Sequence, residues 1–199
     1  MSTTTASPSP QSPDTMTPNQ LARRERLLDA VIELVADGYD EDMQMKDIAE
    51  RAGVALGTMY RYFSSKDHLV AAALVHWASG LDQGVTRRAP KGTPAERLTA
   101  ALHQALVAYQ RRPAFARLLV MVANSSDPNA SACYAELGPV VFGTLGRVIE
   151  DVDPERRERV MKIIGAVWYH CLVEWTIGRM TLAQVDETLE SACHLVLPD

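Results

Sequence analysis

Residues 44–69 constrain the fold most strongly, because their apolar positions predict two short helices joined by a tight turn. The first helix carries Ile48 and Ala49 on its buried face. Gly53 stands where the chain must turn sharply, since a residue without a Cβ adopts a positive φ at little cost. A second helix is expected to begin near Leu56. Two short helices that cross steeply through such a turn form a helix-turn-helix.

The second of these helices carries polar and basic groups on its outer surface. Met59 and Phe63 fill its buried face, so the other side chains are expected to face solvent. Hydroxyl groups, a guanidinium and a backbone without a Cβ suit contacts with phosphates and groove edges of DNA. The predicted contact residues are Gly57, Thr58, Tyr60, Arg61 and Tyr62. The alternative, that these tyrosines are core aromatics of a small helix, stays open.

The segment of about residues 21–81 resembles the DNA-binding domain of the tetracycline-repressor family of bacterial transcriptional regulators. The resemblance rests on three runs: RRERLLDAVIELVADGYD, DIAERAGVALGTMYRYFSSK and KDHLVAAAL. It implies a helix-turn-helix over residues 44–63, in which Lys46 contacts a phosphate or a guanine and Lys66 contacts a phosphate. It also implies that Leu56 lies at the leading edge of the recognition helix, where many members have a polar residue.

Within the family, VALGTMYRYF and the following SKDHL are similar to bacterial repressors of cholesterol catabolism. That similarity implies an effector that is a CoA thioester of a steroid acid or of another acyl group. The family resemblance also implies a homodimer on a palindromic double-stranded DNA operator.

The composition allows a cytoplasmic regulator and excludes several other classes. Hydrophobic residues make up 47% of the 199 residues, yet no run approaches the length of a membrane span. The Ser/Thr/Pro-rich residues 1–17 predict a disordered arm. Three cysteines without metal-ligand spacing favour a reduced cytoplasmic protein with no metal and no cofactor. A net charge of −5 argues against a non-specific nucleic-acid coat.

The whole chain is expected to be all-α, with about nine helices. A three-helix DNA-binding domain is expected over residues 18–66, and a helical ligand-binding and dimerisation domain over residues 67–199. One long helix should run from Lys66 towards Arg88, and this helix should connect the two domains. The glycines and Pro139 between residues 129 and 150 predict a kinked helix, close helix contacts or a cavity wall.

A ligand cavity is expected between the helices that begin near Lys66, Thr93, Asn129 and Pro154. Bulky apolar side chains on several of these helices could surround a large apolar effector. The candidate ligand-binding residues are Trp77, Leu81, Leu106, Tyr109, Phe115, Met121, Phe142, Trp168 and Trp175. Each of them taken singly also suits a plain core position.

The last helix carries apolar residues at a spacing of three and four, which is typical of a helical seam. The seam consists of Leu182, Val185, Leu189, Ala192 and Val196. We expect it to form a dimer interface, while packing within one subunit is the alternative. The helix over residues 154–180 is apolar on two sides, which favours burial on two sides.

Two functions fit the sequence, namely a dimeric repressor released from DNA by an effector, and an all-helical small-molecule-binding protein or enzyme without DNA binding. No catalytic triad, carboxylate pair or phosphate-binding loop is recognisable, so an enzyme is not expected. The exposed contact groups around Tyr60 and Arg61 favour the repressor, because a structural helix has no need for them.

Overall fold

The computed structural model describes residues 10–39, 42–85 and 91–197, and for residues 81–85 it describes the backbone alone. Within these ranges the chain forms nine α-helices, two short 3₁₀ helices and no strand. In chain order they are η1 (Pro13–Thr15), α1 (Pro18–Ala36), α2 (Met45–Ala52), α3 (Leu56–Tyr62), α4 (Lys66–Val85), α5 (Pro94–Arg111), α6 (Pro113–Ala123), α7 (Pro128–Gly146), η2 (Arg147–Ile149), α8 (Pro154–Thr176) and α9 (Leu182–Val196). The predicted all-α fold is confirmed.

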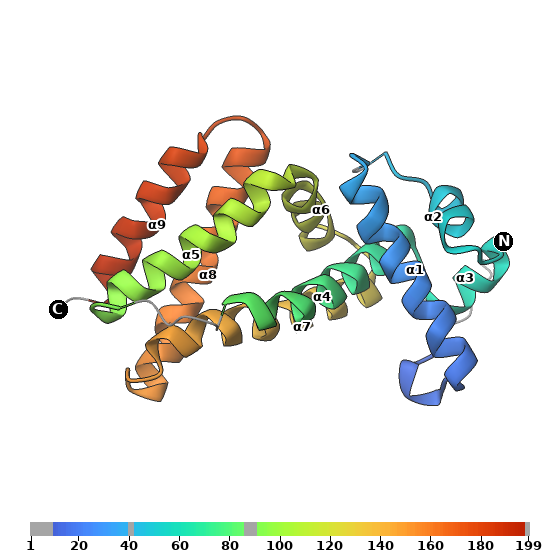
Figure 1. Ribbon diagram of the computed structural model, residues 1–199, viewed down its shortest axis with the longest axis horizontal. Coiled ribbons are helices and arrows are strands. Elements are labelled where there is room, and N and C mark those ends of the chain that lie inside the picture. The colour runs from blue at the N-terminus through green and yellow to red at the C-terminus, as the bar shows by residue number, and fades with distance from the viewer. Residues whose placement is uncertain (1–9, 40–41, 86–90, 198–199) are drawn as a thin grey trace, which may run out of the picture.

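The molecule is elongated, and helices α1–α3 form a separate unit at one end (Figure 1), which we call the head. α4 leaves the head and packs along α7, while α9 packs on both α5 and α8 at the other end. α6 contacts both α4 and α8. α4 and α7 therefore connect the head to the rest of the molecule.

The turn of the helix-turn-helix has the backbone that the sequence predicts. Gly53 ends α2 in the left-handed region with φ +61°, and the Val54 N–H donates to the Ala49 carbonyl at 3.0 Å. A Cβ added at Gly53 would meet nothing within 4 Å. The positive φ, and not crowding, therefore explains the glycine.

Apolar side chains of all three head helices meet in one core. Leu27 from α1, Ile48 from α2, and Met59 and Phe63 from α3 and its end are fully buried. The Arg24 guanidinium lies over the Phe63 ring, 5.2 Å from its centroid, in a cation–π contact. This core determines which side of α3 faces outward.

The N-terminal segment differs in part from the disordered arm expected over residues 1–17. Residues 1–9 lie outside the described residues. Residues 10–17 are packed on the head: Pro13–Thr15 form η1, the Met16 side chain is buried, and the Gln11 N–H donates to the Arg61 carbonyl at 2.9 Å. The correction has a simple cause, since Met16 supplies an apolar anchor within an otherwise polar segment.

The later helices begin at caps that the sequence already contains. Thr93 forms a capping box with Glu96 at the start of α5, and Asp153 caps α8. α4 is described as far as Val85, so the predicted end at Arg88 lies outside the described residues. None of the described helices is long and apolar enough to span a membrane.

Candidate nucleic-acid interface and effector cavity

The outer surface of α3 carries most of the predicted DNA contacts. Leu56 is 42% exposed and Tyr60 is 49% exposed, and Arg61 also faces solvent. Gly57 is exposed, and a Cβ there would meet nothing within 4 Å, so internal packing does not require glycine. Thr58 is half-buried on the same helix. These residues form a polar and aromatic face that is accessible to a binding partner.

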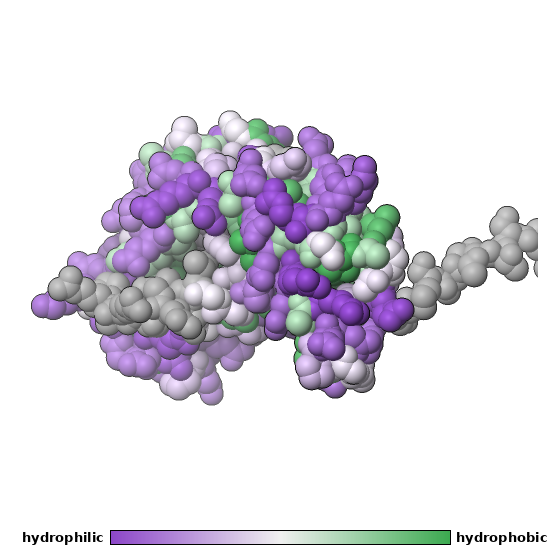
Figure 2. All heavy atoms as spheres, turned by 45° about the vertical axis from the view of Figure 1, so that its right-hand side comes forward, coloured by the Kyte–Doolittle hydropathy of each residue, from purple (hydrophilic) through white to green (hydrophobic). Residues whose placement is uncertain are grey.

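Two lysines flank this face. Lys46 is exposed at the start of α2, where its Nζ lies 3.7 Å from a carboxylate oxygen of Glu50. Lys66 is half-buried at the first position of α4. With the head end turned forward, Figure 2 shows a mainly hydrophilic surface that small hydrophobic patches interrupt. A surface ion pair such as Lys46–Glu50 contributes little energy, so a phosphate can replace it.

The expectation that Tyr62 faces outward is wrong. Tyr62 is only 2% exposed, and its hydroxyl has no hydrogen-bond partner among the described residues. Residue 62 follows Met59 by three positions, which places both side chains on the same face of a helix. Tyr62 is therefore a core aromatic of the head, as the alternative interpretation held.

Polar side chains join the head to the first turn of α7. We call Ser64, Ser65, Asp67, Ser125, Asp127 and Asn129 the interdomain cluster. Asp127 caps α7 and accepts hydrogen bonds from the hydroxyls of Ser64, at 2.7 Å, and Ser65. The Ser125 hydroxyl donates to the Asp67 carboxylate, and the Asn129 amide donates to the Ser64 hydroxyl at 3.0 Å. The turn that follows α3 is thus hydrogen-bonded to residues at the start of α7, which belongs to the ligand-binding domain.

The interdomain cluster favours an ionised Asp127. Partial burial opposes ionisation, but the hydroxyls of Ser65 and Ser64, the Asn129 N–H and the nearby His68 outweigh it and lower the pKa of Asp127 to about 2. Asp127 is therefore a carboxylate at neutral pH and acts only as an acceptor.

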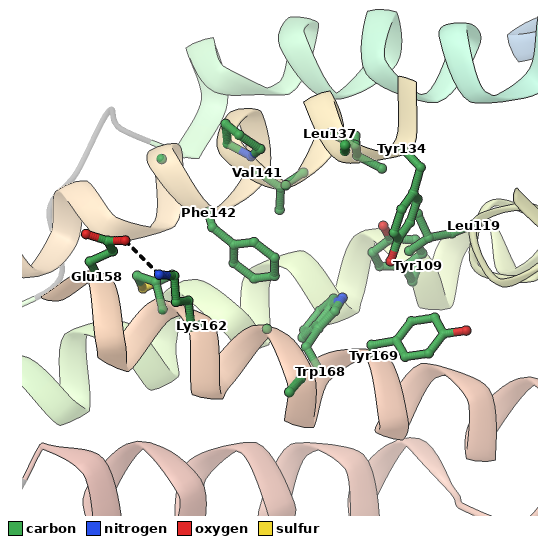
Figure 3. Close-up of a pocket in the computed structure, with 17 residues that line it drawn as sticks. Tyr109, Leu119, Tyr134, Leu137, Val141, Phe142, Glu158, Lys162, Trp168 and Tyr169 are labelled. Carbon is green, nitrogen blue, oxygen red and sulfur yellow. Dashed lines mark ion pairs between the residues drawn. The ribbon is translucent and has the colours of Figure 1, made fainter. Parts of the chain in front are cut away.

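A large apolar cavity of about 830 Å³ lies between α5, α6, α7 and α8. Figure 3 shows aromatic side chains from several helices pointing into it. Its lining consists of Tyr109, Leu119, Tyr134, Ala135, Leu137, Gly138, Pro139, Val141, Phe142, Gly143, Glu158, Met161, Lys162, Gly165, Ala166, Trp168 and Tyr169. The volume suits a large organic molecule. The predicted cavity wall between residues 129 and 150 is confirmed.

Three of the nine candidate ligand-binding residues line this cavity: Tyr109, Phe142 and Trp168. Trp77 and Phe115 stack on each other with ring centroids 4.4 Å apart, and Trp77 also meets Tyr109 edge-on at 6.2 Å. They therefore support the cavity wall from behind. This second layer follows from the size of the rings, which fill the space between α4, α5 and α6.

Of the other four candidates, three do not fit the prediction and one is not tested. Leu106 is a core residue, while Met121 and Trp175 are half-buried and are not among the described residues that line the cavity. The Leu81 side chain lies outside the described residues. Among the α4 residues whose side chains are described, none lines the cavity. α7 lies between α4 and the cavity, because it packs along α4.

Several lining residues were not among the sequence candidates. Tyr134 and Tyr169 carry hydroxyls near one end, and the Asn124 amide donates to Tyr169 at 3.0 Å. At the other end Glu158 and Lys162 form an ion pair of 2.8 Å. No periodic signal distinguishes these residues from surface residues, since helical spacing indicates a shared face but not what the face borders.

The predicted dimer seam is buried within the subunit. Val185 and Leu189 are at most 1% exposed, and α9 packs on α5 and α8. Leu182, Ala192 and Val196 are half-buried on the same helix and pack against the core. The alternative interpretation, packing within one subunit, is therefore right for this seam. Amphipathic spacing alone does not reveal which helix covers the apolar face.

Comparison with known proteins agrees with the geometry. Residues 27–73 match the family model of bacterial regulatory proteins of the tetR family, and residues 92–196 match that of the tetracyclin repressor-like C-terminal domain. The chain belongs to the tetR family, a class of DNA-binding transcriptional regulators. The first match covers the head from residue 27 onwards, and the second covers every residue that lines the cavity.

Among its relatives is the HTH-type transcriptional repressor KstR of Rhodococcus jostii, 35% identical over 90% of this chain and 85% of that protein. KstR of Mycobacterium tuberculosis is 31% identical over 90% and 83% of the two chains. A TetR regulator from Rhodococcus sp. RHA1 has a similar structure, with a TM-score of 0.79 and 26% identity over 91% of this chain and 98% of that one. The FadR repressor of Thermus thermophilus, solved with lauroyl-CoA, shares the fold at a TM-score of 0.66 and 22% identity, over 87% and 93% of the chains.

Proposed function

We propose that the protein is a dimeric repressor that binds a palindromic operator and leaves it when a bulky, largely apolar effector fills the cavity. One observation carries the proposal. α7 forms a wall of the cavity, packs along α4, and begins at Asp127, which holds the turn behind the recognition helix. A ligand that moves α7 therefore acts on the head at a direct contact.

The DNA-binding part is supported by the outer face of α3. We propose that Gly57 and Thr58 read groove edges and that Tyr60, Lys46 and Lys66 bind phosphates, with Leu56 and Arg61 beside them. Phosphate contacts set orientation, whereas base-edge contacts set sequence preference. Tyr62 is excluded from this set because it is buried.

The dimer is supported by the outward side of α8, in place of the buried seam. Ile163 is 49% exposed and Ile177 is 54% exposed. Between them Ala166, which also lines the cavity, His170 and the half-buried Val173 continue the same row at a spacing of three and four. We propose that a second copy of the chain covers this row, because exposed apolar side chains in such a row mark an interface and because two heads are needed for a palindrome.

The effector class is supported by the cavity and by the relatives. A cavity of about 830 Å³ with mostly apolar lining suits a long acyl chain or a steroid. FadR repressors that share the fold have been solved with lauroyl-CoA and with stearoyl-CoA. We propose an acyl- or steroid-CoA thioester as effector.

The switch requires the effector to prefer the conformation in which the heads do not fit DNA. The two recognition helices of a dimer must lie about 34 Å apart to enter adjacent turns of a groove. Moving the population from 1:99 to 99:1 takes about 5.5 kcal/mol of preference. A dimer that binds two effectors divides this free energy between them, so that each effector supplies about half of it.

Operator titration tests the proposal. Duplex DNA selected by the protein from random sequences serves as operator, and lauroyl-CoA serves as effector. Tyr60→Ala combined with Lys66→Ala is expected to weaken binding to all sequences, whereas Thr58→Ala is expected to change sequence preference. A folded double variant that keeps full affinity would contradict the assignment of the DNA-binding face.

A further inference from the structure

A second, smaller chamber of about 380 Å³ adjoins the large cavity. It lies among the last turn of α7, the η2 turn and the first turns of α8. Four residues line both spaces: Phe142, Gly143, Glu158 and Met161. The two spaces are therefore neighbours that a few side chains separate.

Phe142 is the side chain best placed to separate them. Figure 3 shows its ring pointing from α7 towards α8, and a Cβ added to Gly165 of α8 would lie 3.0 Å from Phe142 Cζ. The absence of a Cβ at Gly165 leaves room for the Phe142 ring. Because the ring borders both spaces, a rotation of the Phe142 side chain changes the passage between them.

The two chambers differ in the number of charged side chains. In the large cavity the only charged lining residues described are Glu158 and Lys162, which neutralise each other in a 2.8 Å ion pair. The small chamber shares Glu158 and adds the guanidinium groups of Arg147 and Arg157 and the carboxylate of Glu150. An elongated ligand that passes Phe142 thus leaves an apolar space and meets two guanidinium groups within a charged one.

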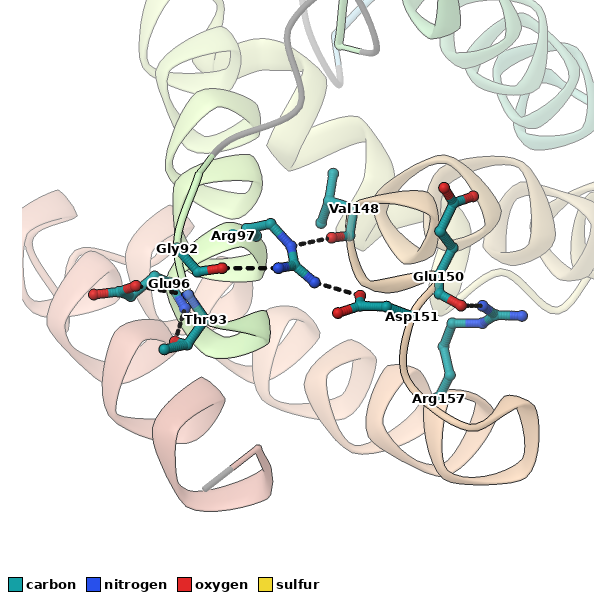
Figure 4. Close-up of polar contacts among 8 residues, drawn as sticks. All are labelled: Gly92, Thr93, Glu96, Arg97, Val148, Glu150, Asp151 and Arg157. Atoms are coloured by element: carbon teal, nitrogen blue, oxygen red, sulfur yellow. Dashed lines mark hydrogen bonds and ion pairs between the residues drawn. The ribbon is translucent and has the colours of Figure 1, made fainter. Parts of the chain in front are cut away.

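The hydrogen bond that the Arg157 guanidinium forms with a described residue goes to a main-chain carbonyl and not to a carboxylate. Its Nη1 donates to the main-chain carbonyl of Glu150 at 3.1 Å, and in Figure 4 the Glu150 carboxylate points away from it. A carbonyl accepts a hydrogen bond without cancelling the charge. The remaining guanidinium donors can form the paired hydrogen bonds that suit a phosphate or a carboxylate.

The wall that carries Arg147 is held in place by α5. Arg97 Nε donates to the Val148 carbonyl at 2.7 Å, its Nη1 donates to the Gly92 carbonyl at 2.8 Å, and its Nη2 pairs with Asp151 (Figure 4). Two of these three contacts, those with Val148 and Asp151, fix the η2 turn on both sides of Ile149. A fixed wall lowers the entropy cost of binding an anion there.

We propose that the small chamber is an anion-binding subsite, in which Arg157 and Arg147 bind the phosphate or carboxylate end of an amphipathic effector whose apolar body fills the large cavity. The proposal rests on the proposed function in that it takes the large cavity as the effector site. It adds the position of the charged end, the two residues that bind it, and Phe142 as the side chain that must move.

Three probes with the same acyl chain test the subsite and distinguish its two anion sources. Lauroyl-CoA carries phosphates, laurate carries a carboxylate, and lauroyl-pantetheine is neutral. Binding to the full-length protein is followed by Trp168 fluorescence and by calorimetry. The variants are Arg157→Ala, Arg157→Lys, Arg147→Ala and, as a matched control, Arg156→Ala. The Arg156 side chain points to the end of α9, where Nη2 lies 3.5 Å from the Val196 carbonyl.

In the wild type we expect the Kd of at least one anionic probe to be at least about tenfold lower than the Kd of the neutral probe. The neutral probe lacks the charge-assisted hydrogen bond that the anion forms. Arg157→Ala and Arg147→Ala should each remove most of that preference, Arg157→Lys should keep part of it, and Arg156→Ala should keep all of it. Equal binding of all three probes, binding of none, or equal losses in Arg157→Ala and Arg156→Ala would overturn the subsite. Probes that bind with the expected preference but leave operator affinity unchanged would instead contradict the proposed function alone.

Discussion

Asp127 accepts a hydrogen bond from the Ser64 hydroxyl at 2.7 Å and thereby ties the first turn of α7 to the turn behind the recognition helix. Ser64 follows α3 by two residues, and Asp127 precedes a helix that walls the cavity. Residues 63 positions apart in the chain thus connect the two proposed activities. Several hydrogen bonds to one ionised carboxylate make this joint directional as well as strong.

Replacing Asp127 with alanine is expected to uncouple the effector from the operator. The change removes the α7 cap and the acceptor for Ser64 and Ser65, at a cost of about 0.5–2 kcal/mol in stability. The ratio of operator Kd with and without lauroyl-CoA should fall several-fold, while lauroyl-CoA affinity stays within about a factor of three. Asp153→Ala is the matched control, since Asp153 caps α8 in the same way. Equal ratios in the two variants would contradict this role.

Acidification is expected to weaken the same joint through His68. His68 is buried, and its Nδ1 accepts a hydrogen bond from the Ser64 N–H at 3.2 Å. Burial lowers the pKa of His68 and Arg24 adds to this, while Asp127 opposes it. The neutral ring is therefore favoured in the folded state. Its contribution is complete above the unfolded pKa of about 6.5 and is lost as the pH falls through the lower folded value.

The measurement is the Tm at pH 7.5 and at pH 5.5. Wild-type protein should lose more stability on acidification than His68→Gln, which has no proton to gain. If both proteins lost the same amount, the pH dependence would have to arise at other groups.

The helix-turn-helix was predictable from the sequence because its determinants are local. Gly53 requires a positive φ, and Met59 and Phe63 are close enough in the chain to define one buried face. Tyr62 was misplaced because a helix of two turns has a wide buried face, and residue 62 lies at its edge. Local spacing does not determine how wide that face is.

Long-range partners were harder to predict. Val185 and Leu189 show the spacing of an interface, but that spacing is the same whether the partner is α5 of one subunit or a second copy. The cavity lining depends on where α7 and α8 face each other, and Phe142 meets Gly165 across that gap. Only the tertiary packing brings such residues together.

Gly165→Ala is expected to weaken binding of lauroyl-CoA without unfolding the protein. The new Cβ would lie 3.0 Å from Phe142 Cζ, so the ring, which lines the cavity, must shift by a few tenths of an ångström. We expect a loss of about three- to tenfold in affinity, which calorimetry measures. Gly138→Ala is the control, because Gly138 lines the same cavity and a Cβ there would meet nothing within 4 Å. Equal losses in both variants would remove the special role of Gly165.

Charged substitutions on α8 and α9 should separate the dimer interface from the core. Ile163→Glu changes a side chain that is 49% exposed, so the subunit should stay folded and become monomeric. Val185→Lys places a charge in the core, where Val185 is fully buried, and should cost more than about 3 kcal/mol of stability. Sedimentation and thermal unfolding distinguish the outcomes. A folded Ile163→Glu dimer would move the interface away from this row.

The most direct test of the account is a single titration in which operator release and effector binding are read in the same sample. A fluorescent operator duplex reports release, and Trp168, which lines the cavity, reports lauroyl-CoA binding. We predict that both signals follow one curve in the wild type, and that in Asp127→Ala the Trp168 signal persists while release is lost. Effector binding in the wild type that leaves the operator bound would contradict the claim that the cavity controls the head.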